Sequence, residues 1–350
     1  MFIRGEFPEE DLSFVNKPIR VVQYGIGPIG AAIVRLMLEK PGLEIVGAID
    51  VDPAKAGKDL GEVAGAGRKL GVAVSAAAPP VLKAGGDIVV HTTSSYLVDV
   101  KDQLLECLDA GLNVVSTTEE LSYPFRKHPE LSRLLDSRAQ ERQVALLGTG
   151  VNPGFAMDKL ALTLATVCHK VEAVEVRRVV NASKRRLPLQ KKVGAGLTVE
   201  EFRAQVAAGI LKHHGLPESA AMIADGLGLA VDRIEETIEP MVAEEKVVTE
   251  FLEVAAGRVA GVHQVARAFA GGKQLIFLEL KMYVGAKESI DAVTIHGLPE
   301  LNLAVNGGIH GDLATVAVTV NCIPEVIQAR PGLRTSRDIP MSFFPGLATA

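Results

Sequence analysis

A glycine-rich turn near the start of the chain constrains its fold more than any other feature. The residues Gly25-Ile26-Gly27-Pro28-Ile29-Gly30 directly follow the apolar run IRVVQY and open a segment with apolar residues at helical spacing. In such a turn the first glycine permits the tight bend, the second lets the backbone approach a pyrophosphate, and the third lets the helix pack on the strand. The helix N-terminus then offers free N–H groups to the phosphates. The pattern predicts a dinucleotide site with contacts from Gly25, Gly27, Pro28, Ile29 and Gly30.

An acidic residue stands where a dinucleotide site would place one. Asp50 ends the second predicted strand, EIVGAID, about 20 positions after Gly30, where a carboxylate accepts hydrogen bonds from the adenosine ribose. Because a carboxylate repels a 2′-phosphate, Asp50 favours NAD(H). Lys55 and Lys58 are close enough in sequence to reach a 2′-phosphate, so use of NADP(H) as well stays open. The alternative interpretation is a glycine-rich turn followed by an unrelated acidic residue.

Strand-like and helix-like segments alternate as far as residue 150. Short runs rich in Val, such as GDIVVHTT and NVVSTT, are separated by amphipathic segments such as VDVKDQLLECLDAG. This alternation is typical of βαβ units, which form a parallel sheet with right-handed crossovers. Aromatic residues make up only 4% of the chain, so the core must consist mainly of Val, Ile, Leu and Ala, as a sheet covered by helices requires. We expect an α/β protein that begins with a Rossmann parallel sheet.

The alternation stops at the turn GVNPGF, residues 150–155, where we place a hinge to a second domain. Longer runs beyond it alternate apolar and polar residues, which favours a half-exposed, mostly antiparallel sheet. These runs are KVEAVEVRRVV, RIEETIEP, KVVTEFLEVAAGRVAGVHQVARAFA, KQLIFLELKMYVG and SIDAVTIHG; TVEEFRAQVAAGILKHHG and PESAAMIADGLGL are expected to be helical. Near the end, DLATVAVTVNCIPEVIQARPGL is expected to be helical with a break at its proline and to pack on the first domain.

The expected domain organisation follows from these patterns. It comprises an N-terminal arm at 1–17, a dinucleotide-binding Rossmann domain at 18–150, an α+β substrate and dimerisation domain at 151–312, and a C-terminal segment at 313–350 that returns to the Rossmann domain.

Composition and charge exclude several classes of function. The net charge is −5, and the basic stretch from Arg177 to Lys192 lacks interleaved aromatic residues, so we expect no nucleic-acid partner. We assign that stretch to substrate closure or to a subunit interface. No apolar run approaches the roughly 20 residues of a membrane span, and the acidic N-terminal segment lacks the apolar core of a secretion signal. We therefore expect a cytoplasmic protein without a membrane partner. Its three widely spaced cysteines indicate neither a disulfide framework nor a zinc cluster.

Short polar side chains follow two further strands of the expected sheet. The sequence HTTSS begins at His91 and the sequence STTEE begins at Ser116. Because ligands lie at the carboxyl ends of parallel strands, we expect these hydroxyl groups to contact the ribose and the nicotinamide. The alternative for each is ordinary helix N-capping. The residues assigned to the cofactor in this way are Thr92, Thr93, Ser94 and Thr117, together with Asn152 of the hinge turn.

Two adjacent glutamates are the candidate catalytic groups. Glu119 and Glu120 stand at the mouth of the NVVSTT strand, where partial desolvation would raise the pKa of a carboxyl group toward a value useful to a general base. Thr117 and Glu120 also have the T-x-x-E spacing of a capping box, which gives Glu120 a structural explanation. We therefore place Glu119 first and keep Glu120 as the alternative.

Phe155 and His263 are assigned to the substrate pocket. Phe155 closes the hinge turn, and His263 stands beside a glycine in the sequence GVHQ. The other histidines considered lie in polar sequence contexts and are expected at the surface: His128, His169, His213 and His214. No set of His, Cys, Asp or Glu residues has metal-ligand spacing, so we expect no metal.

Several segments together resemble one group of dehydrogenases. They are VVQYGIGPIG, EIVGAIDVDP, KAGKDLGEV, HTTSSYL, NVVSTTEELSYP, GTGVNPGF and the tail PGLRTSRDIP. From about residue 18 to about residue 345 the chain is similar to the branch of dihydrodipicolinate-reductase-like proteins that contains 2,4-diaminopentanoate dehydrogenase and the native amine dehydrogenases. The paired-histidine, lysine and PSGT signature of dihydrodipicolinate reductase itself is absent, and NASKRRLPLQKKVGAG occupies the comparable region.

The resemblance implies a fold and an activity. The fold is a Rossmann domain joined to a mixed α/β substrate and dimerisation domain. The activity is NAD(P)-dependent interconversion of a primary amine with a ketone or aldehyde plus ammonia, with the glutamate of TTEE as the catalytic carboxylate. In that reaction the carbinolamine loses water, hydride is transferred to the iminium, and the carboxylate relays protons.

Two other functions stay open at this point. One is an imine or carbonyl reductase of the same fold, and the other is an NAD-binding sensor without turnover. In each case we expect a homodimer formed mainly through the second domain, because an antiparallel sheet with few helices leaves one face to be covered.

Overall fold

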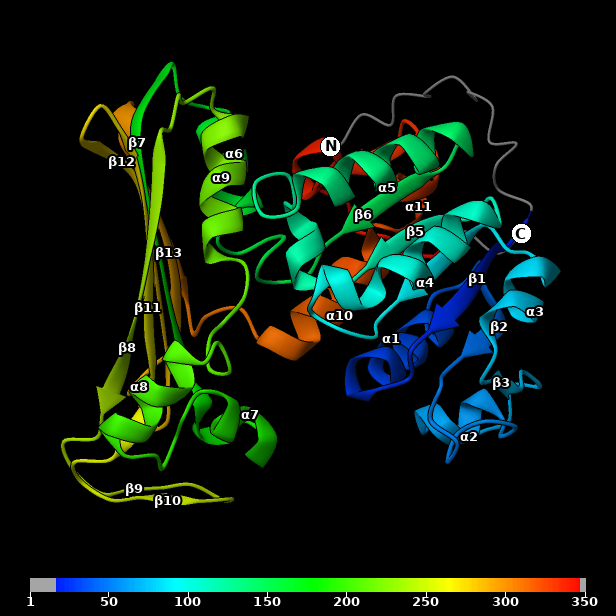
Figure 1. Cartoon of the computed structure of the whole chain (residues 1–350), viewed down its shortest axis with the longest axis horizontal. Coiled ribbons are helices and arrows are strands. Elements are labelled where there is room, and N and C mark those ends of the chain that lie inside the picture. Colours follow the sequence, from blue (N-terminus) through cyan, green and yellow to red (C-terminus); the bar gives the residue numbers. More distant parts are fainter. Residues whose placement is uncertain (1–16, 347–350) are drawn as a thin grey trace, which may run out of the picture.

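The computed structural model describes residues 17–346 and shows two α/β units side by side (Figure 1). The first unit, blue and cyan, contains a seven-stranded sheet, and the second, mostly green and yellow, contains a six-stranded sheet. The predicted α/β architecture, with a Rossmann sheet first and an α+β domain second, is therefore confirmed. The predicted N-terminal arm lies outside the described residues, apart from Lys17.

Every strand pair in the seven-stranded sheet is parallel. The strand order is β15-β6-β5-β4-β1-β2-β3, which is the Rossmann order with one further strand added at the edge. The order reverses between β1 and β4, so the ligand crevice of such a sheet lies beyond their carboxyl ends. The strands are β1 (Ile19–Tyr24), β2 (Leu43–Ile49), β3 (Val74–Ser75), β4 (Ile88–His91), β5 (Asn113–Ser116), β6 (Ala145–Gly148) and β15 (Gly332–Arg334).

Helices bury both faces of this sheet. Val21 packs into the core on the α1 side and its neighbour Val22 into the core on the α4 side, because successive side chains of a strand point in opposite directions. Each fully buried valine stabilises the fold by about 1.5–3 kcal/mol, which explains why the strands read as continuous apolar runs. The helices of this unit are α1 (Pro28–Leu38), α2 (Leu60–Ala64), α3 (Ala78–Ala84), α4 (Leu97–Asp109) and α5 (Pro129–Glu141).

The end of the chain returns to the first unit. Helices α10 (Gly311–Asn321) and α11 (Ile323–Gln328) supply Val316, Val320 and Val326 to the core on the α1 side of the sheet. The predicted break falls between these two helices, where a proline occupies the first turn of α11. Strand β15 then pairs with β6 at the sheet edge.

The six-stranded sheet of the second unit is mixed, with the order β14-β13-β7-β12-β11-β8. All of its neighbours are antiparallel except β12 and β7, as the mostly antiparallel prediction requires. Helices α6 (Lys159–Ala165) and α9 (Leu216–Gly226) cover the face that turns toward the first unit (Figure 1). The strands are β7 (Lys170–Asn181), β8 (Arg233–Val242), β11 (Val259–Ala270), β12 (Lys273–Tyr283), β13 (Ile290–Leu298) and β14 (Leu301–Asn306).

Parts of the second unit differ from the sequence prediction. The run from residue 246 to residue 270, expected to be a single strand, forms β9 (Val247–Val248), β10 (Glu253–Val254) and β11. The turn before β11 contains Gly257 at φ +79°, which a side chain would strain, so the chain reverses there. Helix α7 (Leu187–Lys192) was not predicted, whereas α8 (Val199–Ala207) lies within the segment TVEEFRAQVAAGILKHHG that was expected to be helical.

Candidate active site

The glycine turn has the geometry that phosphate binding requires. Gly25 adopts φ +87°, and a Cβ at this position would lie 2.6 Å from the Thr92 carbonyl oxygen. A Cβ on Gly30 would lie 2.1 Å from the Gly25 carbonyl oxygen, so that position must stay bare for α1 to approach β1. A Cβ on Gly27 would meet nothing within 4 Å. Space is therefore open beside Gly27, at the N-terminus of α1, where Pro28 and Ile29 form the first turn.

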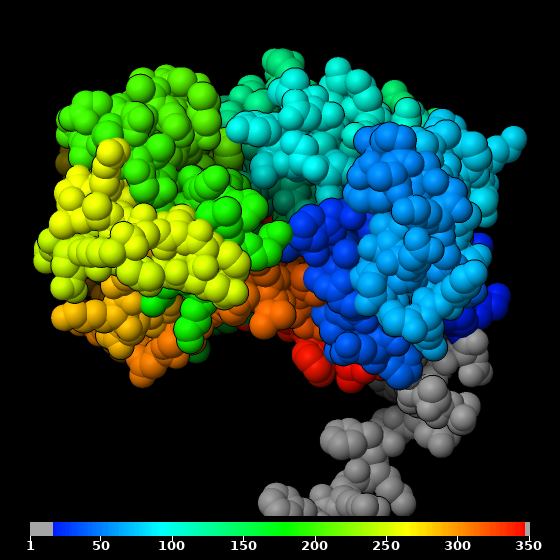
Figure 2. Space-filling model, turned by 90° about the horizontal axis from the view of Figure 1, so that it is seen from below, coloured from blue at the N-terminus to red at the C-terminus, as the bar shows by residue number. Residues whose placement is uncertain are grey.

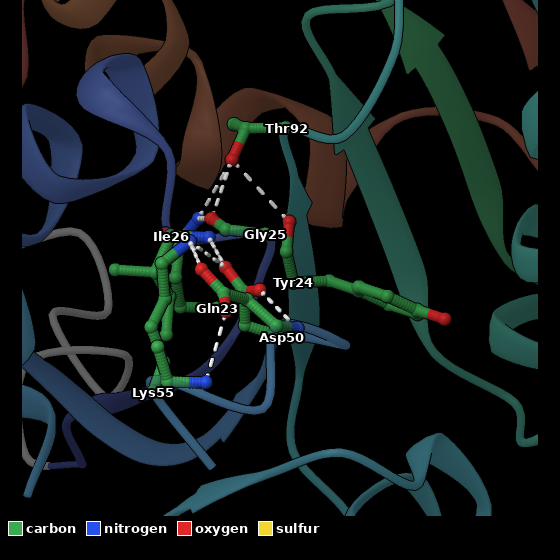
Figure 3. Close-up of polar contacts among 9 residues, drawn as sticks. Gln23, Tyr24, Gly25, Ile26, Asp50, Lys55 and Thr92 are labelled. Carbon is green, nitrogen blue, oxygen red and sulfur yellow. Dashed lines mark hydrogen bonds and ion pairs between the residues drawn. The ribbon is translucent and has the colours of Figure 1, made fainter. Parts of the chain in front are cut away.

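Asp50 links the end of β2 to this turn (Figure 3). Its carboxylate accepts hydrogen bonds from the Ile26 N–H at 2.7 Å, the Asp52 N–H at 2.9 Å and the Lys55 ammonium at 2.9 Å. Burial acts to raise the pKa of Asp50, but these donors outweigh it and the pKa is lowered. Asp50 is therefore an anion at neutral pH, with a lysine already beside it.

Thr92 and Gln23 hold the first glycine in place (Figure 3). The Thr92 hydroxyl donates to the Gly25 carbonyl at 2.7 Å, and the Gln23 amide donates to the same carbonyl at 2.8 Å. The Gln23 amide also donates to Thr92 Oγ1 at 3.0 Å. The structure therefore places Thr92 against the glycine turn.

The hydroxyl groups of Thr93 and Ser94 have partners within the protein. Thr93 Oγ1 donates to Gln103 Oε1 at 2.8 Å, and Ser94 Oγ accepts from the Tyr96 N–H at 3.2 Å, just before α4 begins. The backbone N–H of Thr117 donates to the His91 carbonyl. This contact of Ser94 stabilises the turn before α4 and does not cap the helix, whose N-cap residue is Tyr96.

Glu120 does not form the predicted capping box with Thr117. Thr118 precedes the short 3-10 helix η2 (Glu119–Ser122), and no side chain caps that helix. The Glu120 carboxylate instead accepts from the Leu97 N–H at 2.9 Å, from the Lys127 ammonium and from His128 at 3.0 Å. Burial opposes ionisation, but these donors prevail and lower the pKa of Glu120. The capping-box prediction is wrong because donors from outside the turn occupy the Glu120 carboxylate.

Glu119 has the opposite surroundings. Its Oε2 atom is buried and has no hydrogen-bond partner among the described residues. Burial raises the pKa of this carboxyl group, and the positive charge of Lys192 and the Ser95 side chain oppose that rise only in part. A raised pKa moves this carboxyl group toward the range in which a general acid–base works.

Glu119 lines a cavity of about 140 Å³ where the two units meet. The walls come from η2, the hinge turn, α7, the segment before α9, strands β11 and β12, and the start of α10. Side chains such as Leu189, Val262 and Met282 make much of the lining apolar. The surface of the molecule is hollowed between the green and yellow second unit and the blue and cyan first unit (Figure 2). A small organic molecule can therefore lie against Glu119 with most of its surface buried.

Asn152 lines the same cavity, and both polar atoms of its side chain are buried without a partner among residues 17–346. Asp158 stabilises the hinge turn that carries Asn152. The Asp158 carboxylate accepts from the Gly154 N–H and from the Ser219 hydroxyl, each at 2.8 Å. The turn is thereby tied to α9 of the second unit.

Phe155 and His263 do not lie in the cavity that contains Glu119. Phe155 lines a separate cavity of about 350 Å³, between α10 and the C-terminal segment, because the hinge turn bends away after Asn152. On β11 the side chain of Val262 faces the Glu119 cavity, so His263 points to the other face of the sheet. There its Nε2 atom contacts Glu279 at 2.9 Å. The structure therefore does not bring Phe155 or His263 together with Glu119.

The cavity also contains residues that the sequence prediction placed elsewhere. His213, expected at the surface, lines it, as do Arg185 and Lys192 of the basic stretch. Arg185 is paired with Asp312 at 2.7 Å. The only sequence signal was the concentration of basic residues in a segment without nucleic-acid character, which was assigned to substrate closure or to an interface.

Within residues 17–346, no group of three or more His, Cys, Asp or Glu side chains is placed to hold a metal ion. Over the same residues, no helix combines the length and apolar character needed to cross a membrane.

Two sequence families match the chain. Residues 19–123 match the family described as the N-terminus of dihydrodipicolinate reductase, and residues 155–344 match the family described as the 2,4-diaminopentanoate dehydrogenase C-terminal domain. The first match covers the glycine turn and both glutamates. The second covers most of the cavity walls.

Whole-length relatives agree with these matches. A 2,4-diaminopentanoate dehydrogenase from Acetoanaerobium sticklandii is 32% identical over 335 residues, which is 92% of this chain and 94% of the relative. An amine dehydrogenase from Streptomyces virginiae is 25% identical over 92% of this chain and 96% of its own length. The structure of an amine dehydrogenase from Mycobacterium smegmatis superposes with a TM-score of 0.83 at 32% identity, covering 95% of this chain and 99% of that one.

Proposed function

Because the chain belongs to the 2,4-diaminopentanoate dehydrogenase family, we propose that it is an NAD(H)-dependent dehydrogenase acting on a primary amine. The amine is converted to a ketone or aldehyde plus ammonia, and the reverse reaction is a reductive amination. The observation that carries this proposal is Glu119, a carboxyl group with a raised pKa and a buried, unpartnered oxygen atom in an inter-domain cavity.

The residues of the glycine turn fit the cofactor. The open space beside Gly27 and the N-terminus of α1 would take the pyrophosphate, and Asp50 would hold the adenosine ribose. Asn152 offers both a donor and an acceptor, the pair of groups that a nicotinamide carboxamide matches. When bound, the nicotinamide supplies or accepts the hydride. Lys55 at 2.9 Å from Asp50 supports additional use of NADP(H), since an ammonium can meet a 2′-phosphate.

Glu119 handles the protons of the exchange between nitrogen and oxygen. In the amination direction its carboxylate takes a proton from ammonium, which frees the nitrogen lone pair to attack the carbonyl carbon. As the C–N bond forms, the carboxylic acid gives its proton to the carbonyl oxygen, and the carboxylate then takes a proton from the newly bonded nitrogen. That proton passes to the hydroxyl of the carbinolamine, so that water can leave. The carboxylate that remains stabilises the iminium cation by charge. The apolar walls around Val262 and Met282 exclude bulk water, which strengthens this interaction.

The proposal is tested by NADH oxidation with a panel of small ketones and aldehydes, with and without ammonium. Oxidation that requires ammonium, together with NAD⁺ reduction by the corresponding amine, is the expected result. Oxidation that proceeds equally well without ammonium identifies a carbonyl reductase and contradicts the proposal. If the protein binds NADH but turns over none of these substrates, the proposal is contradicted and an NAD-binding sensor without turnover is favoured.

A homodimer formed through the second unit is part of this proposal. The two helices α6 and α9 cover one face of the six-stranded sheet, and the other face carries both charged and aromatic groups, including His263, Glu279 and Phe277. A second copy covering that face removes it from water. Light scattering should give about twice the chain mass of 37.1 kDa, and a monomer at every concentration would contradict this arrangement.

A further inference from the structure

Buried polar atoms without partners gather in the cavity that contains Glu119. They are Glu119 Oε2, both side-chain polar atoms of Asn152, and Nδ1 of His213. Leaving one such atom unsatisfied costs about 1–3 kcal/mol, so folded proteins seldom leave several together. Their convergence on one cavity indicates that a ligand completes their hydrogen bonds.

The backbone around His213 is held firmly. The His213 N–H donates to Gln264 Oε1 at 2.9 Å, and the Gln264 amide donates to the His213 carbonyl at 2.7 Å and to Glu236 at 2.8 Å. Two residues later, Gly215 adopts φ +108°, and a Cβ there would lie 2.5 Å from the Pro153 ring. The segment that carries His213 is thereby packed directly on the hinge turn that carries Asn152.

The imidazole of His213 is uncharged at neutral pH. Burial and, to a smaller extent, the positive charges of Lys192 and Arg178 lower its pKa to about 3, while the nearby His214 backbone opposes that shift. No hydrogen bond of ordinary geometry joins that backbone to the Nδ1 atom. A neutral imidazole offers one N–H donor and one acceptor, which suits an uncharged oxygen better than an ammonium group.

We propose that His213 hydrogen bonds the oxygen atom that is exchanged for nitrogen. This inference rests on the proposed function and assigns different steps of the reaction to two residues. Glu119 moves the protons of nitrogen and water, and His213 holds the oxygen of the attacking water, of the carbinolamine hydroxyl and of the product carbonyl.

The protons and electron pairs balance in the direction of amine oxidation. After hydride transfer, the water oxygen forms a bond to the iminium carbon while one water proton passes to the Glu119 carboxylate. Glu119 then protonates the amino nitrogen, the C–N bond breaks with its electron pair going to nitrogen, and the hydroxyl oxygen forms the carbonyl. The hydroxyl proton returns through Glu119 to the departing ammonia, which leaves as ammonium. His213 only donates or accepts a hydrogen bond throughout.

The two parts of the reaction can be separated in time. Hydride transfer from the amine comes first and needs no oxygen contact, whereas hydrolysis of the iminium follows and does. His213→Leu should therefore form one NADH per active site, in a rapid first turnover, at close to the parental rate. Its steady-state rate should be about 10²-fold lower, the typical effect of removing one donor from a developing oxygen centre. His213→Asn, which keeps a hydrogen-bonding group near the Nδ1 position, should recover part of the steady-state rate.

His214→Leu is the matched control. His214 is the next residue, is also buried with an unpartnered Nδ1 atom, and packs edge-on against Tyr96 with ring centroids 4.7 Å apart, but it does not line the cavity. Both kinetic phases of His214→Leu should stay close to those of the parent. Melting temperature and NADH affinity of each variant show whether it is folded, and His213→Asn carries the test alone if His213→Leu does not fold.

The outcomes separate the inference from the proposed function. If no primary amine that is tested supports NAD⁺ reduction by the parent enzyme, both the proposed function and this inference are overturned. A parent that turns over beside His213 variants with an unchanged steady-state rate overturns the inference alone. Equal loss of the first turnover and of the steady state in the folded His213 variants also overturns it, because hydride transfer would then depend on His213. If His214→Leu also lowers the steady-state rate while keeping the first turnover, the effect comes from the shape of the loop and the inference is overturned.

Discussion

The turn that binds the nucleotide and the cavity between the two units differ in how their polar atoms are satisfied. Around Gly25, the carboxylate of Asp50, the Thr92 hydroxyl and the Gln23 amide nitrogen are all engaged in hydrogen bonds within the protein. Around Glu119, several buried polar atoms have no partner among the described residues. In the first region Gln23 Oε1 has no partner among residues 17–346, but the other groups named are satisfied within the protein. The second region leaves more of its buried polar atoms for a ligand to satisfy.

Two neighbouring residues show the same contrast on a smaller scale. Glu120 has three donors and a lowered pKa, whereas Glu119 has a raised pKa and an oxygen without a partner. Both are in the same turn, η2, so secondary structure does not distinguish them. The hydrogen-bond partners distinguish the two carboxyl groups, which should therefore respond in opposite ways to substitution.

The largest effect is expected for Glu119→Gln. The amide cannot take up a proton or balance an iminium charge, so turnover should fall about 10²- to 10⁴-fold. Stability should be retained or rise by about 1 kcal/mol, because the neutral amide removes the cost of a buried charge. Steady-state kinetics, NADH titration and thermal melting on the same preparation measure the three quantities. Parental turnover, or loss of NADH binding together with turnover, would contradict this assignment.

Glu120→Gln should affect stability instead. Weakening hydrogen bonds from Lys127, His128 and the Leu97 N–H to a buried carboxylate should cost about 2 kcal/mol of unfolding free energy and leave turnover at its parental order of magnitude. Denaturant titration measures the cost. A Glu120→Gln variant that melts like the parent but does not turn over would reverse the roles of the two glutamates.

The stabilisation by Glu120 should also depend on pH. Because the folded-state pKa lies below the ordinary value of 4.5 for a glutamate, this contribution is fully present above about pH 4.5 and is lost as pH falls through the folded-state pKa. The difference in unfolding free energy between the parent and Glu120→Gln should therefore shrink in acid. A difference that stays constant across this range would show that the carboxylate charge is not what stabilises the turn.

The smallest effect is expected at the nucleotide turn. Asp50→Ser removes the negative charge near the adenosine ribose and releases Lys55, which should improve the ratio of kcat/KM for NADPH over NADH by about 1–2 kcal/mol, or roughly tenfold. Adding Lys55→Ala should remove most of that gain. An unchanged ratio in Asp50→Ser would mean that Asp50 does not contact the ribose.

The fold was predictable wherever sequence-local patterns determine it. The glycine turn, the position of Asp50 and the alternation of strands and helices identify the parallel sheet before any contact is known, because each depends on residues close together in the chain. In the second unit, the strand prediction failed between residues 246 and 270, where Gly257 turns the chain within an otherwise strand-like run.

The candidate site was predictable only in part. His213 has polar neighbours in sequence, but Gln264 of β11 and the hinge turn bury it, and neither contact leaves a trace in the local pattern. Likewise, the T-x-x-E spacing at Thr117 is real, yet Lys127 and His128 take the Glu120 carboxylate. Such side-chain contacts distinguish a catalytic candidate from a structural group, and the local sequence pattern does not specify them.

The central claim is that Glu119 handles the protons of an amine–carbonyl exchange. The most direct measurement is NADH oxidation by the parent and by Glu119→Gln, with one accepted carbonyl substrate, across a titration of ammonium. We expect the parental rate of NADH oxidation to rise from near zero and to saturate with ammonium. We expect Glu119→Gln to bind NADH, with a rate of oxidation that stays near zero at every ammonium concentration. A parental rate that is independent of ammonium, or a Glu119→Gln variant with the parental ammonium dependence, would contradict it.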